Sequence, residues 1–102
     1  MKYQLALQLP ASSIRDYDEM IRLEQAIHAG LGELGEVDGH DAGSGEMNMF
    51  VLTNEPRLAF ERIMVLLETR GFVRELRAAY REIGMNDFTI IYPAGLTCFA
   101  IA

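Results

Sequence analysis

The sequence predicts a single α+β domain spanning residues 1–102, in which strands and helices alternate along the chain. Apolar residues recur at every second position in some segments, which is typical of half-buried strands. In other segments they recur at every third or fourth position, which is typical of amphipathic helices. Stretches containing glycine or proline separate these segments. Half of the residues are hydrophobic and 24% are charged, a composition typical of one folded domain.

The first strand and the first helix are predicted over residues 2–9 and 13–31. One side of the strand is formed by Tyr3, Leu5, Leu7 and Leu9, and the other by Gln4, Ala6 and Gln8. Pro10 ends this strand because it cannot donate a backbone hydrogen bond. Ser13 and Asp16 resemble a capping box, with Asp in place of Glu, and therefore predict the start of the helix.

The next two strands, residues 37–42 and 46–53, are predicted to form a hairpin. The three-residue loop 43–45 joins them and contains two glycines. Alternation within each strand then decides which side chains share a face of the sheet.

A second helix is predicted over residues 55–70, where apolar side chains again recur with helical spacing. Asn54 can cap its first turn, and Pro56 suits a position inside that turn. Gly71 suits the position after the last helical residue, where a left-handed backbone conformation is common.

Residues 72–83 fit either type of secondary structure. Good helix formers favour a helix, and alternation over residues 75–82 favours a strand. We predict a strand, because a fourth strand would pair with the edge left open by the first β-α-β unit. Residues 88–92 are predicted to form a short strand in a hairpin with it, and residues 93–102 a tail or a final edge segment.

The resulting order of elements is that of a ferredoxin-like βαββαβ two-layer sandwich, with room for an extra C-terminal strand. Right-handed crossovers place both helices on one face of an antiparallel sheet and leave the other face open.

Composition excludes several classes of function. The formal net charge of −6 argues against a nucleic-acid partner, because such proteins concentrate lysine and arginine on one face. The apolar runs are too short to cross a bilayer, so no membrane partner is predicted. The single cysteine, Cys98, leaves no internal disulfide and is typical of a reducing compartment, so we expect a cytoplasmic location.

The predicted hairpin carries an unusual group of polar residues for a turn with strand-like flanks. With the loop at 43–45, His40 faces Asn48, and alternation places the group on the open face of the sheet. The candidate ligand-binding residues are Asp38, His40, Glu46 and Asn48.

This group of polar residues has three chemical interpretations. Asp38, His40 and Glu46 offer ligands for a divalent metal, but their spacing matches no established pattern, so no metal or cofactor is predicted. His40, held by Asp38 or Glu46, is a candidate catalytic acid–base, although no nucleophile accompanies it. A solvated hairpin in which the polar groups bond to one another needs no further partner, and the sequence favours it.

Three runs of residues resemble a group of small bacterial ferredoxin-like α+β proteins that have no assigned activity: EVDGHD at 36–41, GSGEMN at 43–48 and AYRE at 79–82. The resemblance covers nearly the whole chain, but it identifies no catalytic residues in it. In fold alone, the chain is also similar to amino-acid-binding regulatory domains and to small dimeric α+β-barrel monooxygenases and isomerases. It has no motif diagnostic of either.

We therefore expect a non-catalytic module that binds a small ligand or another protein. The alternative is a small cofactor-independent enzyme of the dimeric α+β-barrel type that uses His40 as acid–base. The open face, with Phe50 and Leu52 among polar groups, predicts a homodimer that covers it.

Overall fold

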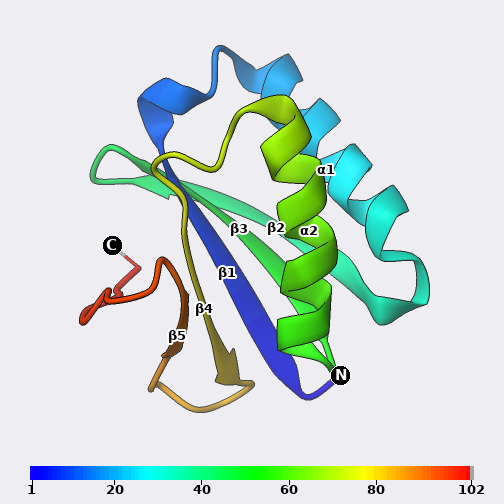
Figure 1. Cartoon of the computed structure of the whole chain (residues 1–102), viewed down its shortest axis with the longest axis vertical. Helices are drawn as coiled ribbons and strands as arrows, with labels where there is room; N and C mark the ends of the chain where they lie inside the picture. Colours follow the sequence, from blue (N-terminus) through cyan, green and yellow to red (C-terminus); the bar gives the residue numbers. More distant parts are fainter. Residues whose placement is uncertain (102) are drawn as a thin grey trace.

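The computed structural model of the chain describes residues 1–101. Within them it contains five strands and two α-helices, together with the short 3-10 helices Ala11–Ser13 and Gly32–Leu34. Along the chain they are β1 (Tyr3–Pro10), α1 (Tyr17–Leu31), β2 (Gly35–Gly43), β3 (Glu46–Thr53), α2 (Pro56–Arg70), β4 (Arg77–Glu82) and β5 (Thr89–Tyr92) (Figure 1). The α+β class is confirmed, and so is a strand within the ambiguous segment 72–83.

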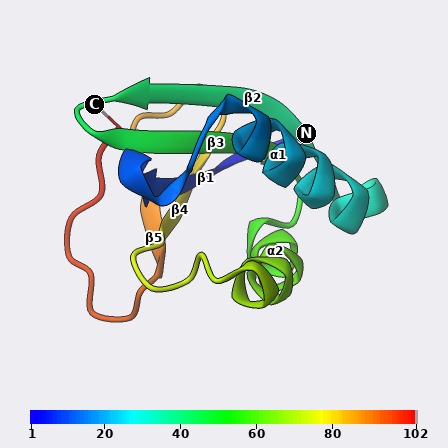
Figure 2. The same ribbon diagram turned by 90° about the horizontal axis from the view of Figure 1, so that it is seen from above.

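The strands form one antiparallel sheet in the order β2-β3-β1-β4-β5. β1 lies at the centre and pairs with β3 on one side and with β4 on the other. β5 pairs with β4 as the predicted hairpin, which makes β2 and β5 the two edges (Figure 2).

The hydrophobic core lies between the sheet and the helices. Leu5, Leu7 and Leu9 of β1 belong to it, as the period-two alternation predicts. The helices contribute Met20, Leu23, Ile27 and Leu31 from α1, and Ala59, Phe60, Ile63 and Leu67 from α2. Full burial of each large aliphatic side chain contributes about 1.5–3 kcal/mol, so this cluster is the main source of stability.

The ends of the helices correct two sequence predictions. α1 begins at Tyr17 rather than at residue 13, because the Asp16 carboxylate, and not Ser13, accepts the Glu19 backbone N–H at 2.8 Å. Asn54 does not cap α2; its side chain accepts the backbone N–H of Lys2.

Two other predictions for α2 hold. Pro56 is its first residue, where the missing N–H costs nothing. Gly71 follows the last turn in the left-handed conformation, with φ of 80°.

The hairpin differs from its prediction at two points. Its turn has two residues, Ser44 and Gly45, both with positive φ, which is typical of a type I′ turn. The predicted loop 43–45 is therefore wrong, because Gly43 pairs with Glu46. A β-bulge also interrupts β2: Val37 lies opposite Val51, but Gly39 lies opposite Phe50.

Residues 93–101 follow β5 without regular secondary structure. Figures 1 and 2 both show this segment on the side of the sheet away from the helices. There the Gln8 side-chain amide donates to the backbone oxygen of Ala100 at 2.9 Å, and the rings of Phe88 and Phe99 lie 5.1 Å apart. The face that was predicted to be open is therefore partly covered.

No helix within residues 1–101 has the length and apolar character needed to cross a membrane.

Candidate functional site

The structure divides the predicted polar group between the two faces of the sheet. The bulge adds one residue to β2 after Val37, so every later side chain of this strand changes face. His40 consequently pairs with the core residue Met49, rather than with Asn48 as predicted. Asp38 lies exposed at the bulge. The prediction that these side chains share the open face is wrong for His40.

On the helix side, His40 contacts Glu24 of α1. The His40 Nδ1 lies 2.9 Å from the Glu24 Oε1, and the side chains are 28% and 12% exposed, respectively. The Tyr17 ring lies 6.1 Å from the imidazole, edge toward face. Glu24 could not be identified from the sequence, because it belongs to a different element.

A cavity of about 320 Å³ lies beside His40. Its lining is mostly apolar: Ala11, Ile14, Asp16, Tyr17, Met20, His40, Ala42 and Met47. A carboxylate on Nδ1 orients an imidazole and leaves Nε2 to exchange a proton. The arrangement can therefore support acid–base chemistry on a small molecule with an apolar body.

On the opposite face, a buried pair of amides crosses β1 and β3. Gln8 Nε2 donates to Asn48 Oδ1 at 3.0 Å, and the two residues are 2% and 0% exposed, respectively. The Asn48 Nδ2 is buried without a hydrogen-bond partner among residues 1–101. Buried polar atoms usually have partners, so this pair is unusual within the molecule.

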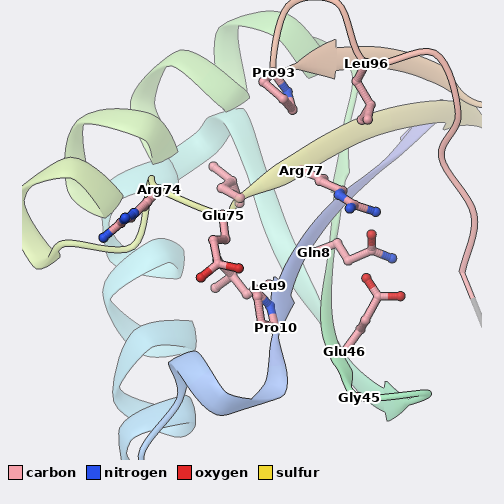
Figure 3. Close-up of a pocket in the computed structure, with 11 residues that line it drawn as sticks. Gln8, Leu9, Pro10, Gly45, Glu46, Arg74, Glu75, Arg77, Pro93 and Leu96 are labelled. Atoms are coloured by element: carbon pink, nitrogen blue, oxygen red, sulfur yellow. The ribbon is translucent and has the colours of Figure 1, made fainter.

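A cavity of about 360 Å³ opens at this end of the sheet (Figure 3). It is formed where β1 ends, where β3 and β4 begin, and where the segment after β5 passes over them. It is lined by Gln8, Leu9, Pro10, Gly45, Glu46, Arg74, Glu75, Leu76, Arg77, Pro93 and Leu96. We call it the sheet-end cavity. In Figure 3 the Arg77, Gln8 and Glu46 side chains lie near one another on one side of it.

The lining of the sheet-end cavity contains two basic and two acidic side chains. Arg74, Arg77, Glu46 and Glu75 have no ion pair within 4.0 Å among the described residues. Arg74, Glu75 and Arg77 are exposed, and Glu46 is half-buried. Ionised side chains of this kind can form strong hydrogen bonds with ligand groups of opposite charge.

Of the residues predicted for the site, Glu46 lines this cavity. Asn48 accepts a hydrogen bond from Gln8, which also lines it. Gln8 and Arg77 were missed. Gln8 was predicted on the same face as Asn48, and that shared face was the available signal. Arg77 is interleaved with glutamates in the sequence, a pattern more typical of a solvated surface.

The hypothetical metal ligands Asp38, His40 and Glu46 are not brought together. Within residues 1–101, no group of three or more His, Cys, Asp and Glu side chains is arranged to hold a metal ion. Cys98 is exposed, in the segment after β5.

Comparison with protein-family models, with curated proteins and with solved structures gives no significant match.

Proposed function

We propose that this chain is a non-catalytic module that binds a small polar ligand in the sheet-end cavity. The observation that supports this most directly is the placement of Arg77 and Glu46, which lie unpaired in a cavity beside the buried amide of Gln8. The cavity volume of about 360 Å³ falls in the range of small-molecule sites. Such sites combine apolar walls with a few fixed polar groups, and here the half-buried Pro93 and Leu96 provide an apolar part of the lining.

A screen of metabolites and divalent metals by thermal shift tests the proposal. A ligand that binds only the folded chain raises the melting temperature in proportion to its occupancy. Leu96→Trp fills the cavity from the segment after β5 and should abolish the shift. Leu58→Trp changes an exposed residue of α2 and is the matched control. Hits that stabilise both variants equally lie outside the cavity and contradict the proposal.

We also propose that the fold is ferredoxin-like, extended by β5. Strands β4, β1, β3 and β2 are neighbours in that order and antiparallel, and residues of both helices share one core cluster. An experimental structure with a helix on the Gln8 side of the sheet would contradict this. The free thiol of Cys98 supports a reducing compartment such as the cytoplasm as the module's location.

A second candidate function is general acid–base catalysis at His40. The contact between His40 and Glu24, beside a mostly apolar cavity, favours it. The chemistry would be removal of a proton from carbon next to a carbonyl group and its return by the same imidazole.

Deuterium incorporation from D₂O into a small 1,3-dicarbonyl compound, followed by NMR, tests this candidate. His40→Ala should abolish the protein-dependent rate, and Glu24→Gln should reduce it. His28→Ala changes an exposed histidine of α1 and is the control. Equal rates in wild type and His40→Ala would rule out this role.

A further inference from the structure

The Gln8 side chain occupies a central place on the face that carries the sheet-end cavity. In the sheet register, Gln8 lies between Asn48 of β3 and Arg77 of β4. Its amide nitrogen makes two hydrogen bonds, to Asn48 Oδ1 at 3.0 Å and to the Ala100 oxygen at 2.9 Å. Both N–H groups are therefore used, and the orientation of the amide is fixed. No hydrogen bond among the described residues uses Gln8 Oε1, which leaves it as an acceptor.

Two residues of opposite charge, Arg77 and Glu46, lie on the same face of the sheet as Gln8. Arg77 is directly opposite Gln8 on β4, and Glu46 precedes Asn48 by two positions on β3, so all share one face. The guanidinium can bind a carboxylate through two hydrogen bonds. The Glu46 carboxylate and Gln8 Oε1 are both acceptors, and a ligand ammonium group has three donors to offer them.

From this arrangement we propose that the sheet-end cavity binds a small zwitterion, with its carboxylate on Arg77 and its ammonium group on Glu46 and Gln8. The inference rests on the proposed function and adds the chemical class of the ligand. Leu96, a half-buried lining residue from the segment after β5, offers an apolar contact to a short aliphatic chain between the two charged ends.

Singly charged ligands fit the same cavity less well. A lone anion on Arg77 would lie in a cavity that also contains Glu46 and Glu75, and a lone cation on Glu46 would meet Arg74 and Arg77. Like charges disfavour binding, although solvent weakens the effect at the exposed Arg74, Glu75 and Arg77, so the lining favours a ligand that carries both charges. Only a ligand with both charges satisfies Arg77 and Glu46 together.

NMR titration of the ¹⁵N-labelled full chain tests the inference. Glycine, β-alanine and 4-aminobutanoate serve as zwitterions of increasing length, and butyrate and butylamine as singly charged counterparts of the longest. At least one zwitterion should shift the amide signals of Gln8, Glu46 and Arg77, with an affinity about tenfold or more above that of either counterpart. Butyrate binding as tightly as 4-aminobutanoate would overturn the zwitterion assignment.

Two variants locate the charges. Arg77→Gln should weaken zwitterion binding about tenfold or more, and Glu46→Gln should remove the preference for the zwitterion over butyrate. Arg22→Gln and Glu61→Gln change exposed charges on the helices and should leave both quantities unchanged.

The outcome separates the ligand class from the site itself. If no zwitterion binds, but another compound from the thermal-shift screen does and is blocked by Leu96→Trp, the ligand class is wrong and the binding function stands. If nothing binds in the cavity, both proposals are wrong.

Discussion

Gly35, the first residue of β2, lies where two strands approach each other closely. A Cβ atom at this position would lie 2.6 Å from the Leu52 backbone oxygen, which cannot move without disturbing the sheet. We therefore expect Gly35→Ala to lower the free energy of unfolding by about 1–3 kcal/mol, as overpacking typically does.

Gly30 offers a matched control for this substitution. It lies within α1, where an added Cβ would be 3.7 Å from the nearest side chain. Gly30→Ala should stabilise the protein by about 0.5–1 kcal/mol, because alanine is the better helix former. Urea denaturation measures both changes. A Gly35→Ala variant as stable as wild type would show that β2 can shift away from β3.

The contact between His40 and Glu24 links β2 to α1, and the Glu24 side chain is the more buried of the two. We expect His40→Ala to lower the free energy of unfolding by about 1 kcal/mol, since it leaves the Glu24 carboxylate without its partner. A double-mutant cycle with Glu24→Ala should give a coupling energy above about 0.5 kcal/mol. A coupling energy near zero would show that this pair contributes no more than an ordinary surface ion pair. His28→Ala is the control and measures the effect of losing an exposed imidazole.

At the level of elements, Asp16 determines where α1 begins. Hydrogen bonding from the Glu19 backbone N–H, and then from Arg15, lowers the pKa of the Asp16 carboxyl below its ordinary value of 3.8. Because the folded state favours the charged form, the stabilisation is complete above 3.8 and is lost as the pH falls through the lower folded pKa.

Asp16→Asn keeps an N-cap acceptor and removes the charge. We expect the melting temperature to fall less between neutral and acid pH in this variant than in wild type. The other titrating groups are the same in both proteins, so the difference between the two falls reports on Asp16. Asp18→Asn, within the same helix turn, is the control. Parallel pH profiles for wild type and Asp16→Asn would contradict the assigned role.

Local patterns predicted most of the elements. Alternation identified β1 and β3, helical spacing identified α1 and α2, and Gly71 marked the end of α2. The start of α1 was misplaced because Ser13 and Asp16 are both good N-cap residues. Only the folded chain shows that Asp16 accepts the backbone N–H. The path of residues 93–101 could not be predicted, because it depends on contacts with β1 far away in the sequence.

The candidate site was harder to predict because one extra residue in β2 moves the later side chains of this strand to the other face of the sheet. Gly39 has φ of +110° and lies at the bulge, and a glycine inside an expected strand is a recognised sign of one. That signal was available and would have separated His40 from Asn48. The contact with Glu24 was not available, since it depends on how α1 packs against the sheet.

For the molecule as a whole, the exposed part of the non-helical face still predicts self-association. Phe50 and Leu52 are half-buried on this side of β3. We expect a concentration-dependent dimer by light scattering at high micromolar concentration. Leu52→Lys should weaken it, and Val65→Lys, on the exposed surface of α2, should not. A strictly monomeric mass would show that residues 93–101 cover enough of the face.

The bulge in β2 lies on an edge strand, where strands of other molecules could pair with the sheet. β2 is the longer of the two edge strands, and a regular edge of this length is a template for pairing with strands of other molecules. The bulge interrupts that template, and the exposed carboxylates of Glu36, Asp38 and Asp41 repel the same strand of a second copy. We therefore expect the irregularity that separates His40 from Asn48 to protect the sheet also against open-ended, amyloid-like growth from this edge.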